Sequence, residues 1–198
     1  MNDKKARRDI AYRPSPAFKD KLTMAETAGV GLACFFAAMI CAVIQTGFFL
    51  SFRPFGCAPD LCMALSLAVG LKFGPKCGGI VGLISGFFVD SLAAVGFSLA
   101  IPFYLSLGIL IGILAEPESG VNLPPFPLFL LGLVCGSGAI SAASLINILM
   151  NYSMPGPAQL FLGSLLPQFL SDLVFGPAVY PPVALTLRLL QKKQRFVK

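Results

Sequence analysis

The sequence has no histidine and no tryptophan, and only 12% of its 198 residues are charged, whereas a soluble domain carries roughly 25% charged residues. Apolar residues make up 56% of the chain, and the mean hydropathy is +0.81. So little charge cannot cover a surface in water, which predicts an integral membrane protein. The lack of histidine removes the usual Ser/His and Cys/His nucleophile pairs and the commonest metal ligand. We therefore expect no enzyme activity, no cofactor and no metal site.

Three long stretches contain no charged residue at all. They lie between Glu26 and Arg53, between Asp90 and Glu116, and between Glu118 and Asp172. About 20 consecutive apolar residues cross a bilayer, so each stretch can hold a membrane-spanning helix. The last one can hold more than one, and the turn-forming residues Asn151 to Pro157 predict a hairpin break within it.

Capping and turn signals divide the chain into six helices. Thr23 and Glu26 have the spacing of a capping box, and Pro59 suits the first position of a helix. Four prolines are expected to distort the last helix. The predicted helices are residues 23–49, 59–73, 75–90, 97–115, 126–150 and 165–190. The expected fold class is all-α, a polytopic membrane domain of six transmembrane helices over residues 23–190, between basic tails at 1–22 and 191–198.

The second and third predicted helices are short. About 15 residues at 1.5 Å each reach only about 22 Å, against a hydrocarbon core of about 30 Å. Either the bilayer thins and Lys72 and Lys76 extend toward the headgroups, or the two helices form a re-entrant hairpin buried in protein. Both arrangements leave the two termini on the same side of the membrane.

Basic residues predict the orientation of the chain. Lysine and arginine stay preferentially on the cytoplasmic side, and here they gather in the two tails and in the loop that contains Lys72 and Lys76. Six spans then place both termini in the cytoplasm and leave only Arg53 outside. We also expect the first tail to contact anionic membrane lipid. Nucleic acid binding is not expected, because the tail includes three aspartates and no folded basic surface is predicted.

Small residues recur every four positions on four of the predicted helices, a pattern that lets two helix backbones approach closely. The third helix carries Gly78, Gly82 and Gly86, here called the glycine face. The first helix carries Ala33 and Ala37 within a similar series from Gly29 to Cys41. Most such faces pack within one chain. Because four faces exceed what folding needs, we expect at least one to bind a partner helix.

Three acids fall within membrane depth, where each costs about 2.5 to 3.5 kcal/mol at the bilayer centre. Asp60 follows Pro59 at a predicted helix start, where the helix dipole favours an acid. Asp90 ends the third helix and is expected to be solvated or to cap the next helix. Asp172 follows Gln168 by one turn and is the best candidate for a buried polar contact. We expect these acids to be isolated from one another, which provides neither an active site nor a proton relay.

The order of these motifs resembles the rod shape-determining protein MreD family. The similarity lies in the stretch from Phe52-Arg53-Pro54 to Pro59-Asp60-Leu61, in the glycine face ending at Asp90, and in the Gly96-Phe97 turn. It continues to the closing segment from Leu166 to Leu190, within which Asp172 departs from the family pattern.

The resemblance implies a non-enzymatic inner-membrane scaffold subunit of the bacterial elongation (rod) complex, which controls cell shape and lateral peptidoglycan synthesis. Its implied partners are an MreC-like protein, the MreB filament, and the complex of RodA with a class B penicillin-binding protein. Among the residues of this chain, we expect the glycine face and the region around Asp90 to be structurally critical, and the sequence leaves open which helix face binds which partner.

A second interpretation comes from a different class of protein. The six-helix size and the Ala33 and Ala37 face also resemble the substrate-capture subunits of energy-coupling-factor vitamin transporters, which dock on a membrane partner through such a face. The predicted outer loops, however, hold almost no polar groups that would orient a polar vitamin. An intramembrane enzyme or ion carrier is disfavoured further, because the sequence shows no paired acids and no metal cluster.

Overall fold

The structure is a computed structural model of the chain that describes residues 24–93, 100–116, 119, 124–151, 163 and 166–185. The chain divides into two compact units, Met1–Cys34 and Phe35–Lys198. The described part of the first unit, from Met24 onward, is helical. The remaining helices belong to the second unit.

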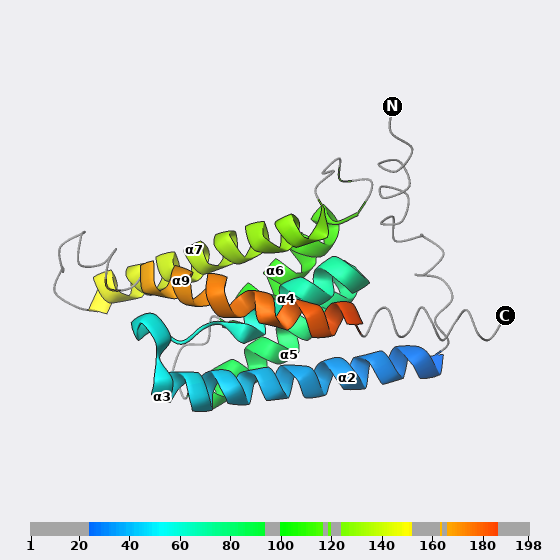
Figure 1. Cartoon of the computed structure of the whole chain (residues 1–198), viewed down its shortest axis with the longest axis horizontal. Coiled ribbons are helices and arrows are strands. Elements are labelled where there is room, and N and C mark those ends of the chain that lie inside the picture. The colour runs from blue at the N-terminus through cyan, green and yellow to red at the C-terminus, as the bar shows by residue number, and fades with distance from the viewer. Residues whose placement is uncertain are drawn as a thin grey trace. The chain divides into compact units, whose positions relative to one another are not determined.

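Helices account for the architecture, and no strand occurs within the described ranges (Figure 1). This confirms the all-α prediction for that part of the chain. The first elements are α2 (Met24–Val43), the π-helix η2 (Ile44–Phe49), α3 (Leu50–Phe52) and the 3-10 turn η3 (Pro54–Gly56). The others are α4 (Leu61–Phe73), α5 (Pro75–Ala93), α6 (Ala100–Leu114), α7 (Pro125–Asn151), α9 (Leu166–Phe175) and the 3-10 turn η6 (Gly176–Val179), followed by a helical segment at 180–185.

Each of the six predicted helices corresponds to a helix in the structure, with corrections at the ends. We predicted that Pro59 is the first residue of the second helix. In the structure Asp60 is the N-cap of α4, so Pro59 lies before this helix. Pro177 lies in η6, and this 3-10 turn interrupts the last predicted helix as its prolines led us to expect. Thr23 of the predicted capping box, both predicted tails and residues 152–157 of the predicted hairpin break lie outside the described residues.

Two helical stretches, Gly31–Phe49 and Pro125–Ala142, are long and apolar enough to cross a membrane. α4 has 13 residues and α6 has 15, so both are apolar but shorter. α5 has 19 residues, or about 28 Å at 1.5 Å per residue, so it is longer than predicted. Within the described ranges, two stretches therefore qualify as spans by length and composition, and the six-span arrangement stays a prediction.

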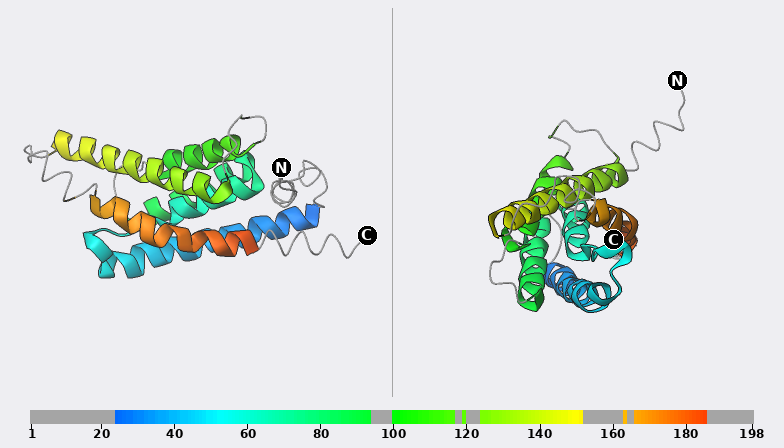
Figure 2. Two further views of the ribbon diagram at one scale, coloured as in Figure 1. Left: turned by 45° about the horizontal axis from the view of Figure 1, so that its top comes forward. Right: turned by 90° about the vertical axis from the view of Figure 1, so that its left-hand side faces the viewer.

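α4 is the central helix of the second unit. All eleven residues from Leu61 to Leu71 are buried. Its neighbours are α5, α6, α7, α9 and η6, and in the end-on view α4 lies between α7, α9 and α5 (Figure 2). Because protein surrounds α4 on every side, its short length does not have to match the thickness of a bilayer.

The glycine face joins α5 to α6. A Cβ atom added at Gly82 would come closer than 3.0 Å to the backbone of Tyr104, and one at Gly86 would meet the backbone of Ile101 equally closely. At Gly78 the neighbouring backbone is that of Gly108, itself the first glycine of a small-residue pair on α6. Backbones this close leave no room for any larger residue, which is the physical reason for the four-residue glycine spacing.

The glycine face, which we expected to serve either helix packing or partner binding, packs against α6 of the same chain. The glycines Gly132 and Gly136, at the same four-residue spacing on α7, are also used internally, since Gly132 faces Leu67 and Ile111, and Gly136 faces Met63. The small-residue faces of α5, α6 and α7 are therefore contacts of the fold itself.

We predict that Gly82→Ala destabilises the folded protein by about 1 to 3 kcal/mol, because the added methyl group has to displace backbone atoms of α6. Gly138→Ala on α7 is the matched control, since a Cβ there meets nothing within 4 Å. An alanine at that helical position is expected to stabilise the protein by up to about 1 kcal/mol. Thermal unfolding of both variants in detergent tests this, and equal unfolding temperatures would contradict the close contact.

Candidate functional site

The amino end of α4 is buried, so its free backbone N–H groups need partners within the protein. Asp60 is the N-cap residue, and its Oδ1 accepts a hydrogen bond from the Met63 N–H at 3.0 Å. The Asp60 carbonyl accepts from the Ala64 N–H at 3.2 Å. Gln45, at the start of the π-helix η2, accepts from the Cys62 N–H through Oε1 at 3.1 Å. Side chains from two elements thus replace the water that would solvate this helix end.

Asp172 of α9 reaches the same point. Its Oδ1 accepts from the Asp60 N–H at 2.6 Å, and its Oδ2 accepts from the Ser137 hydroxyl of α7 at 2.5 Å. Gln168, one turn earlier on α9, donates through Nε2 to both oxygens at 3.1 Å and to the Ala58 carbonyl at 3.2 Å. Asp172 therefore ties α9 to α7 and to the cap of α4.

Tyr104 completes the group from α6, because its hydroxyl donates to Asp60 Oδ2 at 2.5 Å. The hydroxyl is buried with the rest of the side chain, which is 3% exposed. Five elements thus meet in one hydrogen-bonded cluster around the start of α4. We call this cluster the polar node, and its members are Gln45, Asp60, Tyr104, Ser137, Gln168 and Asp172.

The node brings together two carboxyl groups in an apolar interior. Asp60 is 5% exposed and Asp172 is 1% exposed. Burial of an ionised carboxylate is unfavourable unless hydrogen bonds or an opposite charge compensate for the lost hydration. The hydrogen bonds above supply part of this compensation, and the positive end of the α4 dipole lies directly beside Asp60.

The three predicted acids have different outcomes. Asp172 forms the buried polar contact that we predicted, with Gln168 as one of its partners. Asp60 lies at the start of α4 as predicted, where it is the N-cap residue, but our prediction that it is isolated was wrong, because its backbone N–H donates to Asp172. Asp90 accepts from the Ile101 N–H in the first turn of α6 at 3.1 Å, which confirms the cap of the next helix. Asp60 and Asp172 therefore belong to one site and Asp90 to another contact.

Sequence reasoning missed Gln45, Tyr104 and Ser137. Gln45 is the only amide side chain in the charge-free stretch between Glu26 and Arg53, and this was a usable signal. Serine and tyrosine are common in apolar helices, so Ser137 and Tyr104 carried no comparable signal. Tyr104 and Ser137 belong to the node because their hydroxyl groups lie next to the two carboxyl groups. This position results from the packing of α6 and α7 against α4, which the sequence does not reveal.

Ala33 and Ala37, the other sequence-predicted face, both lie on α2. Ala33 belongs to the first unit of the chain and Ala37 to the second, where it is half-buried.

No described group of three or more cysteine, aspartate or glutamate residues could hold a metal ion. The hydroxyl, amide and carboxyl groups of the node can form hydrogen bonds and bind protons.

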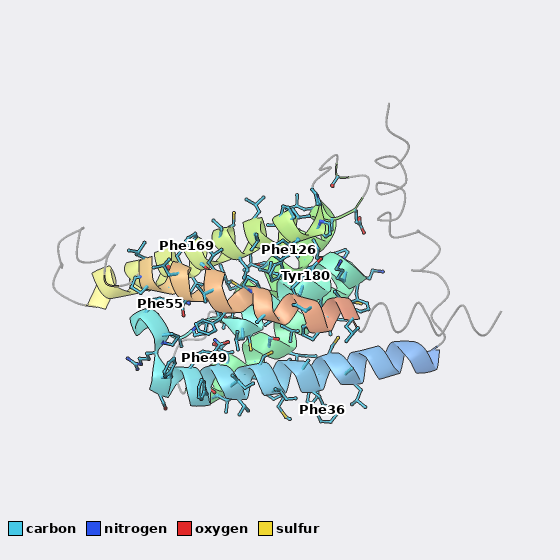
Figure 3. All side chains as sticks on the ribbon, viewed as in Figure 1. Phe36, Phe49, Phe55, Phe126, Phe169 and Tyr180 are labelled. Carbon is cyan, nitrogen blue, oxygen red and sulfur yellow. The ribbon has the colours of Figure 1, made fainter. Side chains whose placement is uncertain are left out.

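The mostly apolar core also contains buried polar side chains, and many large apolar side chains are exposed. Buried polar residues outside the node include Ser66, Ser85 and Ser141. Large apolar side chains instead face outward, and Phe36 projects from α2 while Phe55 lies at the turn before α4 (Figure 3). The exposed set spans the helices around α4 and includes Phe36, Ile40, Phe48, Phe52, Ile80, Phe87, Leu110, Leu131, Val174 and Leu185.

Comparison of the chain with protein-family models, with curated proteins and with solved structures gives no match.

We predict that Tyr104→Phe lowers the free energy of unfolding by about 1.5 to 3 kcal/mol, the usual range for a hydrogen bond to a charged group. Ser106→Ala on the same helix is the control. The Ser106 hydroxyl is exposed and bonds only to the carbonyl of Phe103 in its own helix, so its loss should change little. Thermal or denaturant unfolding in detergent compares the two, and similar effects of both substitutions would argue against the node as a stabilising unit.

Proposed function

We propose that this protein is a non-enzymatic scaffold subunit of the bacterial inner membrane, of the MreD type, which acts in the elongation (rod) complex by binding a transmembrane helix of an MreC-like protein. The observation that supports the proposal is the distribution of polar and apolar side chains. Hydroxyl, amide and carboxyl groups of the polar node pair inside the helix bundle, whereas large apolar side chains face outward and suit lipid or another helix.

The proposal includes a multi-pass arrangement with both termini in the cytoplasm. Lys72 lies in the last turn of α4, with its Nζ 5.0 Å from the centre of the Tyr180 ring, whereas the polar node surrounds the first turn of the same helix. The positive-inside rule then assigns the Lys72 end to the cytoplasmic side and the node and Arg53 to the outer side. The surrounding protein removes the need for α4 itself to span the full hydrocarbon thickness.

Because α6 fills the glycine face, the proposal moves the partner contact to α2. Ala33 and Ala37 lie one turn apart on the helix that contains one of the two spanning stretches. Small residues at this spacing allow close approach of a second helix. The exposed Phe36 and Ile40 flank Ala37 and add apolar contact area.

Site-specific photocrosslinking in cells tests the partner face. A photoreactive residue at Ala37 is expected to crosslink to a co-expressed MreC-like protein. The same residue at Leu110 is the control, because Leu110 is an outward position on α6 with 54% exposure. Crosslinks from Leu110 but none from Ala37 would contradict the α2 face, and no crosslink from either position, with the protein correctly inserted, would contradict the scaffold.

A fluorescent reporter that matures only in the cytoplasm tests the topology. Fused to either end of the full chain, it is expected to fluoresce in both fusions, since the basic residues of both tails stay inside. A reporter at residue 53 in the loop before α4 provides the opposite control and should stay dark. Fluorescence from only one terminus would refute an even number of spans.

Ligand-dependent stability separates the scaffold from the vitamin-capture subunit. A tightly bound ligand stabilises a folded protein by mass action, so a capture subunit should show a raised unfolding temperature with one member of a vitamin panel. The scaffold is expected to show no such shift. A clear shift with a vitamin would favour the transporter subunit over the scaffold.

A further inference from the structure

Two carboxyl groups meet in the polar node without a basic partner within the described part of the chain. The oxygens of Asp60 accept from the Met63 N–H and the Tyr104 hydroxyl. The oxygens of Asp172 accept from the Asp60 N–H, the Ser137 hydroxyl and the Gln168 amide. All of these donors are neutral. The node is therefore rich in hydrogen bonds but contains no full positive charge that would balance two carboxylates.

The other titratable groups around the pair do not supply that charge. Cys62 of α4 and Tyr104 of α6 face Asp60, Cys41 of α2 faces Cys62, and Cys57 faces Asp172. Thiols and phenols are neutral at neutral pH. Arg53 is exposed and faces Cys57. The contacts from η2, α7 and α9, made by Gln45, Ser137 and Gln168, are not titratable.

Besides the neutral hydrogen-bond donors, the α4 dipole opposes the negative charge among the described groups, and a helix N-terminus is equivalent to roughly half an elementary charge. Two ionised carboxylates would therefore leave an excess of more than one negative charge in a buried site. Carboxyl groups that share such a site do not both ionise readily, because each repels the other and both lose hydration. A single proton bound to either carboxyl group of the pair removes most of the excess.

We propose that the pair of Asp60 and Asp172 binds one proton in the folded protein, so that the polar node is a proton-dependent latch that holds α9 and α7 on the amino end of α4. When the chain unfolds, both carboxyl groups enter water, where they are ionised at neutral pH, and the bound proton passes to the solvent. The folded chain thus binds one proton more than the unfolded chain. Its free energy of unfolding consequently falls as the pH rises, by the linkage relation.

Thermal and denaturant unfolding of the full chain in detergent, over a series from mildly acidic to mildly alkaline buffer, tests this latch. The wild type is expected to lose up to about tenfold in its folding equilibrium constant per pH unit, which is the limit for one linked proton. Asp172→Asn keeps the shape of the side chain but removes one charge, so the remaining Asp60 carboxylate does not need to bind a proton. Its stability should be nearly independent of pH over the same range.

Asp90→Asn is the matched control, because this half-buried carboxyl caps α6 away from the pair and should leave the pH slope of the wild type unchanged. Asp60→Asn is the second node variant, since asparagine caps a helix as well as aspartate does. A wild type with no pH slope, or a slope that both node variants retain, would overturn the proposal.

Infrared spectroscopy provides a direct readout that a merely structural role of the aspartates would not produce. At neutral pH the wild type and Asp90→Asn should show the C=O band of a protonated carboxyl group, shifted by 13C-aspartate labelling. The band should be missing in Asp172→Asn and in Asp60→Asn. No such band in the wild type, or its survival in both node variants, would show that the pair does not bind a proton.

Discussion

The contact between Asp60 and Asp172 is the interaction on which the arrangement of the second unit depends. It joins residues separated by 112 positions in the chain, and it lies where a central helix begins without access to water. An uncapped helix end there would leave several backbone N–H groups without partners in an apolar interior, each at a cost of several kcal/mol. The side chains that prevent this come from η2, α6, α7 and α9, so capping α4 also fixes the positions of its neighbours.

Two further features of the second unit accompany the complete burial of α4. Glycines on α5 and α6 let these two helices pack backbone to backbone, and the aromatic residues Phe126, Phe129 and Tyr180 pack together beside the other end of α4, near Lys72. The large apolar side chains that find no room in such a tight interior face outward. A surface of this kind suits lipid or another apolar protein surface, which is why we propose a scaffold subunit in a membrane complex.

Much of the fold could be predicted from local signals. Charge-free stretches, prolines and glycines placed six helices close to their observed positions, and the cap of α6 by Asp90 followed from its place before the helix. The candidate site was harder to predict. Asp60 and Asp172 each looked like a single acid with a local explanation, because sequence spacing carries no information on which helices become neighbours. The glycine face was identified correctly as a close helix contact, but the partner turned out to be α6 of the same chain.

The sequence by itself determined the all-helical class, the approximate helix bounds and the apolar character of the surface, because these depend on residue composition and on hydrogen bonds within a few positions. Only the tertiary structure decided that α4 is the buried centre, that the glycine face is occupied by α6, and that two acids from distant segments share one site. Those outcomes depend on which helices lie side by side. Such neighbours are selected by close packing and by the need of each buried polar group for a partner, and both conditions involve the whole bundle at once.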